Sequence, residues 1–204
     1  KKLFRQRQSR LLMGLAILVA GFYVGHALGI SSTLSARIAM WQAPWDNVVR
    51  GGDQVAQAAW ALAAGGTAGT GLGLGATRYL PAGHTDLALA AVAEELGGVG
   101  SLLVVIAFGV IAVRGLRIAQ AAPTDYGFFL AIAMTLALVV PALVMAAGII
   151  GLIPLTGIVT PFVSYGGSAM VANFAALGLL VAVAVGAAER PGGAAGPDGA
   201  AAGP

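Results

Sequence analysis

Four long apolar stretches decide what this chain can fold into, because a helix needs about 20 predominantly apolar residues to cross the hydrocarbon core of a bilayer. Three of them contain no charged residue, and the second contains Glu94 and Glu95. Hydrophobic residues make up 58% of the chain and charged residues only 9%, unlike an average soluble domain. We therefore expect an all-α polytopic membrane helix bundle with four transmembrane helices, at residues 11–30, 87–113, 126–153 and 161–188.

The distribution of Lys and Arg predicts how these spans are oriented. Most basic residues precede the first span, lie between the second and third, or follow the fourth, whereas the other connections hold only Arg37, Arg50 and Arg78. The positive-inside rule places both termini in the cytoplasm and residues 31–86 in a large outer loop. Residues 191–204 are rich in Pro, Gly and Ala and are expected to form a disordered tail after a membrane domain of residues 1–190. The basic residues assigned to the cytoplasm are Lys1, Lys2, Arg5, Arg7, Arg10, Arg114, Arg117 and Arg190.

The outer loop is predicted to contain secondary structure, since connections of this length usually carry local structure or function. Residues 52–64 show helical spacing of apolar residues at Val55, Ala59 and Leu62. They favour a short interfacial or re-entrant helix, with a helix packed on the bundle surface as the alternative. The tryptophans Trp41, Trp45 and Trp60 are expected to anchor the loop at headgroup level.

The glycine-rich stretch GGTAGTGLGLG at residues 65–75 resembles a phosphate-binding loop, but it lacks the flanking strand and the GK[ST] ending. Its glycines favour tight turns and close backbone approach, with backbone N–H groups that face an anionic ligand as the alternative. The chain has no cysteine, which excludes disulfides, thiolate metal sites and cysteine nucleophiles. Its basic residues form no stripe with interleaved aromatic residues, which speaks against nucleic-acid binding.

Three carboxylates lie at or inside the second apolar stretch. Asp86 is placed to cap a helix that starts at Leu87, or to act as a general base at the membrane face, and both roles can hold together. In a continuous helix Glu94 lies about 12 Å further along the axis than Asp86. Glu94 and Glu95 therefore favour a structural pairing with donors from another helix over a share in the chemistry.

The remaining polar residues of the apolar stretches have structural interpretations. His84 and Asp86 are too few to form a metal site, and the sequence around Ser164 and Tyr165 lacks the G-x-S-x-G pattern of a nucleophilic serine. Pro161 is expected in the first turn of the last helix, and Pro141 is expected to kink the third. His26 is most simply a donor between helices.

Five segments, taken in order, resemble one family, the SEDS (shape, elongation, division and sporulation) proteins. The resemblance covers most of the chain, and the last segment is the most diagnostic. These segments are RIAMWQAPW at residues 37–45, GGDQVAQAAWALAAGGTAGTGLGLG at 51–75, YLPAGHTDLALAAVAEELGGVG at 79–100, RGLRIA at 114–119 and GLIPLTGIVTPFVSYGGSAMVANFAALGLL at 151–180.

The resemblance implies a membrane-embedded peptidoglycan glycosyltransferase of the bacterial cytoplasmic membrane. Such enzymes polymerise lipid II into glycan strands at the outer face, together with a class B penicillin-binding protein, and this chain resembles the C-terminal four spans of their larger bundle. The family's essential carboxylate maps onto Asp86, which is then the catalytic base. Arg37, Arg50 and Arg78 are candidates for contact with the pyrophosphate, and a divalent cation such as Mg or Mn is a further candidate. Further candidates for substrate contact are Trp41, Gln54, His84, Ser164 and Tyr165, and the polar residues given a structural role are Glu94, Glu95 and Asn173.

Some positions depart from the family pattern. Ala43 and Ala82 stand where an acidic residue is usual, Asp53 replaces Tyr in a GYQ motif, and Leu87 replaces the Phe after the Asp. None of these removes Asp86. Two other functions stay open: a transporter that flips lipid II, with the three carboxylates along a polar path, and an inactive scaffold.

Overall fold

The computed structural model describes residues 13–14, 16–17, 19–21, 23–25, 32–46, 52–76 and 83–188, and among them every regular element is helical. The chain divides into two compact units, Lys1–Ala56 and Gln57–Pro204. The first unit contains helix α2 (Ser32–Gln42), which the sequence analysis did not predict. In the expected first span, the described residues 13–14, 16–17, 19–21 and 23–25 are helical. The rest of that span and the predicted tail lie outside the described residues.

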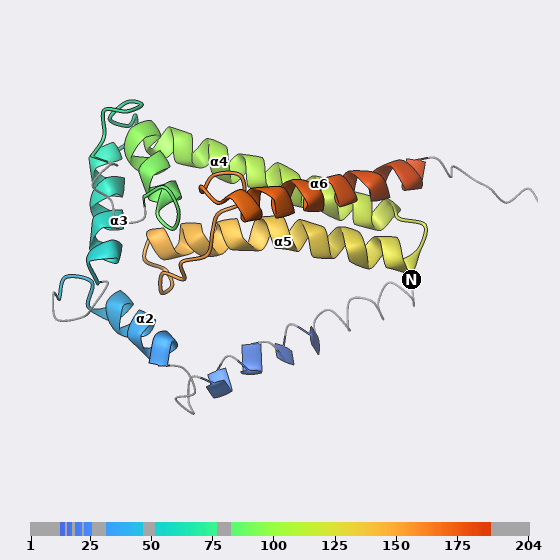
Figure 1. The fold of residues 1–204 in the computed structure, drawn as a ribbon, viewed down its shortest axis with the longest axis horizontal. Helices are drawn as coiled ribbons and strands as arrows, with labels where there is room; N and C mark the ends of the chain where they lie inside the picture. Colours follow the sequence, from blue (N-terminus) through green and yellow to red (C-terminus); the bar gives the residue numbers. More distant parts are fainter. Residues whose placement is uncertain are drawn as a thin grey trace, which may run out of the picture. The chain divides into compact units, whose positions relative to one another are not determined.

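Three helices of the second unit are long and apolar enough to cross a membrane (Figure 1). They are α4 (Ala88–Ala121), α5 (Asp125–Ile149) and α6 (Gly167–Ala188), and they correspond to the second, third and fourth predicted spans. Two boundaries were predicted wrongly. Arg114 and Arg117, expected in a connection, belong to α4, and the last helix begins at Gly167 and not at Pro161.

The turn between α4 and α5 follows from three consecutive residues. Ala122 has the extended backbone (ψ 128) that a residue before proline prefers, so α4 ends ahead of Pro123. Thr124 then caps α5, because its hydroxyl accepts a hydrogen bond from the Gly127 N–H at 3.1 Å. From there α5 continues through Pro141 to Ile149 as one helix, so the kink expected at Pro141 stays a prediction.

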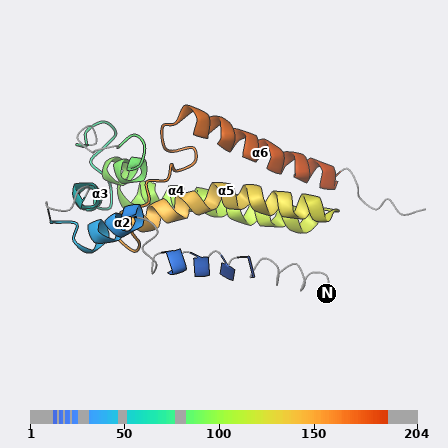
Figure 2. The ribbon, with the colours of Figure 1, turned by 60° about the horizontal axis from the view of Figure 1, so that its bottom comes forward.

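Helices α4 and α5 lie side by side and run in opposite directions (Figures 1 and 2). They approach closely at Gly115, where a Cβ atom would collide with the Thr135 hydroxyl. Helix α6 packs against the pair through its C-terminal half, and Figure 2 shows its N-terminal half further from α5. The buried cluster that joins the three helices consists of Ala119, Phe128, Ala131 and Leu180.

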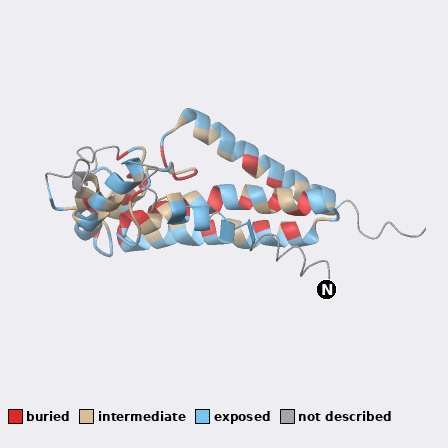
Figure 3. Ribbon diagram, turned by 90° about the horizontal axis from the view of Figure 1, so that it is seen from below, coloured by how far each residue is buried: buried red, intermediate tan, exposed pale blue. Residues whose placement is uncertain are grey.

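The outer surface of the three helices is apolar. Figure 3 shows buried residues at intervals along α4 and α5, with exposed residues between them. Many of the exposed residues are large hydrophobic ones, among them Leu103 on α4, Leu143 on α5 and Phe174 on α6. Such a surface suits helices that face lipid hydrocarbon.

Helix α3 (Gly52–Gly65) matches the helix predicted over residues 52–64. In the second unit its buried side is formed by Ala58, Ala61 and Gly65, whereas Ala59, which was counted on the apolar face, is exposed. Trp60 is also exposed, as a headgroup anchor would be, and the placement of α3 at the membrane interface stays a prediction.

Helix α4 is broken at Gly97, where the sequence analysis expected one continuous span. Gly97 has φ 67 and ψ −164, a backbone conformation open essentially only to glycine. Residues 88–96 therefore form a first segment and residues 98–121 a second, longer one. The break leaves two carbonyls before it and two N–H groups after it without the partners that an unbroken helix would provide.

The glycine-rich loop, residues 66–76, supplies all four missing partners. The N–H groups of Gly98 and Val99 donate to the carbonyls of Gly66 and Thr67 at 2.9 and 3.2 Å. In return, the N–H groups of Thr70 and Gly71 donate to the carbonyls of Glu94 and Glu95 at 2.9 and 3.0 Å. The loop thus replaces one turn of α4, and its contact with the helix is an exchange of backbone hydrogen bonds.

We expect Gly97→Ala to destabilise the protein by about 3 kcal/mol or more, because alanine is strained in this conformation and its Cβ would lie 2.7 Å from the Thr67 carbonyl oxygen. Thermal unfolding of the purified protein in detergent measures the loss. Gly109→Ala on the same helix is the control, since no atom lies within 4 Å of its Cβ position. Equal melting temperatures for the two variants would contradict the role of Gly97.

Candidate functional site

Asp86 lies in a tight turn, residues 83–87, that leads directly into α4. The predicted capping role is wrong: the helix starts at Ala88, its N-cap residue is Leu87, and no side chain caps it. Asp86 is half-buried, and among the described residues none donates a hydrogen bond to its carboxylate. The turn is held in place instead by Leu87, which is 1% exposed.

The connection between α5 and α6, residues 150–166, docks on this turn. The Tyr165 N–H donates to the His84 carbonyl at 2.7 Å, and the two rings meet edge to face with centroids 6.4 Å apart. The structure therefore brings together His84 and Tyr165, which were both predicted from the sequence as substrate contacts, and His84 lies two positions before Asp86 in the chain. Both side chains are exposed, so they can meet a ligand.

Ser164, also predicted as a substrate contact, is turned inward. It is 3% exposed, its hydroxyl accepts from the Thr160 N–H at 3.0 Å, and its own N–H donates to the Thr160 carbonyl at 3.0 Å. These bonds close the turn at residues 160–164, where the sequence analysis had placed the start of the last helix. Phe162 in this turn has φ 63, which is unusual outside glycine, and its ring packs edge to face on Phe174 of α6.

Glu94 and Glu95 bind the glycine-rich loop. The Ala76 N–H donates to Glu94 Oε1 at 2.7 Å, and the Gly73 N–H donates to Glu95 Oε2 at 3.1 Å. These residues were predicted to pair with donors from another helix, whereas the donors observed here come from a loop. The anion that faces these backbone N–H groups is thus part of the chain itself.

The other predicted site residues belong to the first unit, lie on α6 or fall outside the described residues. Arg37 and Trp41 are four residues apart on α2 and so share one of its faces, and Gln54 lies in the first turn of α3. All three belong to the first unit. Asn173 is half-buried on α6, and Arg50 and Arg78 lie outside the described residues.

The described residues do not fit a metal site built by the protein alone. No three His, Asp or Glu residues among them lie close enough together to hold an ion. A divalent cation such as Mg or Mn that helps to bind the pyrophosphate stays a prediction.

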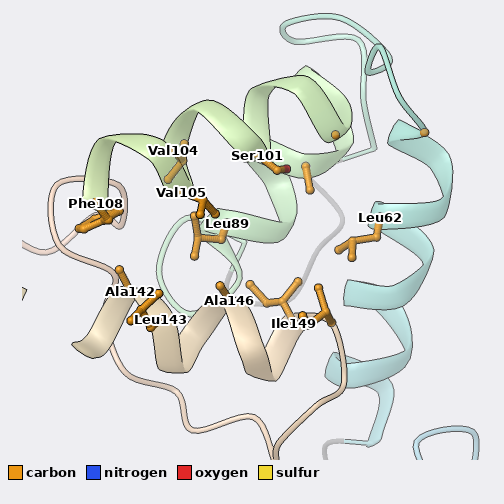
Figure 4. Close-up of a pocket in the computed structure, with 14 residues that line it drawn as sticks. Leu62, Leu89, Ser101, Val104, Val105, Phe108, Ala142, Leu143, Ala146 and Ile149 are labelled. Atoms are coloured by element: carbon orange, nitrogen blue, oxygen red, sulfur yellow. The ribbon is translucent and has the colours of Figure 1, made fainter. Parts of the chain in front are cut away.

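An apolar pocket of about 350 Å³ lies between α3, α4 and α5 (Figure 4). Its lining includes Leu62 of α3, Leu89 in the first turn of α4, Phe108 further along α4, and Ala146 and Ile149 of α5. The Ser101 hydroxyl in its wall is already used, because it donates to the Gly97 carbonyl at 3.0 Å. The pocket offers hydrocarbon contacts and is suited to an apolar chain.

Sequence reasoning missed the docking of the α5–α6 connection on the Asp86 turn and the break at Gly97. A signal for the break was present, since the paired glycines Gly97 and Gly98 interrupt an otherwise apolar helical stretch. No comparable signal points from Tyr165 to His84, because the bond between them joins backbone atoms and carries no side-chain pattern.

The fold and the site define a multi-pass α-helical membrane protein in which the Asp86 turn and the α5–α6 connection lie at one end of three apolar helices. A family model described as cell cycle protein, for FtsW, RodA and SpoVE, matches residues 6–189. The chain belongs to this family, which is the one its motifs resemble.

Three relatives show the extent of the similarity. The chain is 36% identical over 178 residues to the peptidoglycan glycosyltransferase RodA of Mycobacterium leprae (strain TN), with 87% of this chain and 38% of the relative covered. It is 37% identical over 183 residues to the stage V sporulation protein E of Bacillus subtilis (strain 168), covering 82% and 50%. It is 34% identical over 176 residues to a probable peptidoglycan glycosyltransferase FtsW of Geobacter metallireducens (strain ATCC 53774 / DSM 7210 / GS-15), covering 85% and 47%. The chain thus spans 38 to 50% of the length of these relatives.

We expect Ser164→Ala to cost about 1–3 kcal/mol of stability, because it leaves the buried Thr160 N–H without an acceptor. Ser168→Ala is the control, since Ser168 is exposed at the start of α6. Thermal unfolding distinguishes the two variants. A Ser164→Ala protein that melts like the wild type but is inactive would instead make Ser164 a substrate contact.

Proposed function

We propose that this protein acts as a peptidoglycan glycosyltransferase that polymerises lipid II into glycan strands during cell elongation or division. It works at the outer face of the bacterial cytoplasmic membrane, with both termini in the cytoplasm and with a class B penicillin-binding protein as its partner. Support comes from its family and from the names of the Mycobacterium and Geobacter relatives. The positions of Lys and Arg support the orientation.

The observation that carries this proposal is the setting of Asp86. Its carboxylate is half-buried at the start of an apolar helix, whereas Glu94 and Glu95 already accept hydrogen bonds from the glycine-rich loop. A half-buried aspartate in the turn that carries the exposed side chain of His84, on which Tyr165 docks, suits a general base that meets a substrate from the membrane surface.

In the proposed reaction a sugar hydroxyl of one lipid-linked chain attacks the anomeric carbon of the other. Asp86 takes the proton of that hydroxyl as the new glycosidic bond forms, and the bond from the anomeric carbon to the lipid pyrophosphate breaks. The pyrophosphate leaves as an anion and needs positive charge more than it needs an acid. Arg37, Arg50 and Arg78 are the candidates for that charge, with a divalent cation as a further one.

The apolar pocket extends this proposal to the lipid part of the substrate. Leu89 lines the pocket and lies three residues after Asp86, so a polyprenyl chain can occupy the pocket while its sugar lies near the carboxylate. Each buried CH₂ group contributes about 0.8 kcal/mol to binding. Even a few units of the chain would therefore hold the substrate at the site.

We expect Asp86→Ala to lower lipid II polymerisation by about 100-fold or more, the usual contribution of a general base. The measurement is glycan strand formation in vitro by the intact protein with its penicillin-binding partner. Asp125→Asn is the control, because Asp125 begins α5 at the opposite end of α4.

The same assay separates the alternatives. Unchanged polymerisation by Asp86→Ala would remove the catalytic role from this residue. Loss of lipid II movement across vesicles with intact polymerisation would favour the transporter.

We expect Ala146→Phe to raise the KM for lipid II by about tenfold or more, because the larger side chain fills part of the pocket and excludes several CH₂ groups. Ala137→Phe adds the same ring to an exposed position of α5 and is the control. Initial rates at varied lipid II concentration measure the change. Identical KM values for both variants would show that the substrate does not use the pocket.

A further inference from the structure

Glu94 is an unusually placed carboxylate. It is 4% exposed, and burying a charged group costs free energy unless its hydrogen bonds are made. Here the Ala76 N–H donates to one carboxylate oxygen at 2.7 Å, and the Glu94 carbonyl accepts from both the N–H and the hydroxyl of Thr70 at 2.9 and 3.1 Å. One residue of α4 thus holds the glycine-rich loop at two points six residues apart.

The two kinds of bond hold different parts of the loop. Backbone exchange across the break at Gly97 fixes its first half, residues 66–71. The second half has the side-chain bonds, from Gly73 to Glu95 and from Ala76 to Glu94. Because Glu94 is buried and Glu95 is partly exposed, the bond to Glu94 competes less with water and is the stronger of the two.

The loop in turn determines the direction of the first segment of α4. That segment is separated from the long second segment by Gly97, whose backbone conformation breaks the helix, so helical hydrogen bonds do not fix the angle between them. The loop bonds to both sides of the break and fixes this angle, and the Glu94 carboxylate anchors the far end of the same loop at Ala76, which keeps the loop in the position that these backbone bonds require. Asp86 is two residues from the start of the first segment, and Leu87 and Ala90 are buried, so a rotation of the segment carries Asp86 with it.

We propose that Glu94 is a positioning residue for catalysis: by holding the glycine-rich loop closed over the break in α4, it sets the place of Asp86 relative to the bound substrate. Glu95 assists with a weaker bond to the same loop. The inference rests on the proposed role of Asp86, and it assigns Glu94 no contact with the substrate.

The experiment compares Glu94→Ala with Glu94→Gln in the intact protein. Gln keeps an oxygen that accepts from the Ala76 N–H, whereas Ala removes the acceptor. We expect Glu94→Ala to lower kcat by about tenfold or more with little change in KM, and Glu94→Gln to restore most of the loss. Leu138→Ala is the control for a general loss of stability, since Leu138 is fully buried in α5 and does not line the pocket. It should lower the melting temperature and leave kcat unchanged at a temperature where the protein is folded.

A second measurement does not depend on activity. The chain has no cysteine, so Leu72→Cys, at an exposed position of the loop, can carry a nitroxide label whose mobility reports on the loop. We expect the label to become mobile in Glu94→Ala and to stay restricted in Glu94→Gln.

Three results would overturn the inference: a label that stays restricted in Glu94→Ala, a mobile label with unchanged kcat, or a Glu94→Gln protein as impaired as Glu94→Ala. Failure of the proposed function is a separate result, because it appears as polymerisation that survives Asp86→Ala.

Discussion

The four backbone hydrogen bonds across the break at Gly97 are the interaction on which the rest of the structure depends. A spanning helix can be interrupted only where its freed N–H and carbonyl groups find partners, since hydrocarbon provides none. Here residues 66–71 provide them, so a loop distant in sequence becomes part of the helix. As a consequence, the N-terminal end of α4 and the glycine-rich loop form one substructure. Neither can be displaced without leaving polar backbone groups unpaired.

This substructure explains why three carboxylates close in sequence have different surroundings. Glu94 and Glu95 point their oxygens at N–H groups of the loop and act as its acceptors. Asp86 comes before the helix, in a turn that is fixed from the other side by the hydrogen bond between Tyr165 and His84. The candidate site is therefore assembled from turns that are rigid through their backbones, which leaves the side chains of Asp86, His84 and Tyr165 available for a substrate.

The sequence predicted the long elements well, because α4, α5 and α6 coincide with apolar stretches and α3 with a small-residue helical pattern. For Glu94 and Glu95 it predicted polar partners, since a carboxylate in an apolar stretch requires one, but it assigned them to another helix. The sequence could not predict which groups donate to these carboxylates. The N–H groups of Gly73 and Ala76 are common to nearly all residues, so no residue pattern marks them as the donors. The predicted start of the last helix at Pro161 was also wrong. Hydrogen bonds between Thr160 and Ser164, both donated by a backbone N–H, form a separate turn there in place of the first turn of the helix.

The connection between α4 and α5 has a consequence for how the protein is made. With only residues 122–124 between them, the two helices meet at Gly115 and Thr135 through contacts that are local in sequence, and such contacts form early in folding. The pair can thus enter the bilayer as a preassembled hairpin. By contrast, the hydrogen bond from the Tyr165 N–H to the His84 carbonyl joins residues 81 positions apart, so we expect the α5–α6 connection to dock on the Asp86 turn only after the hairpin has formed.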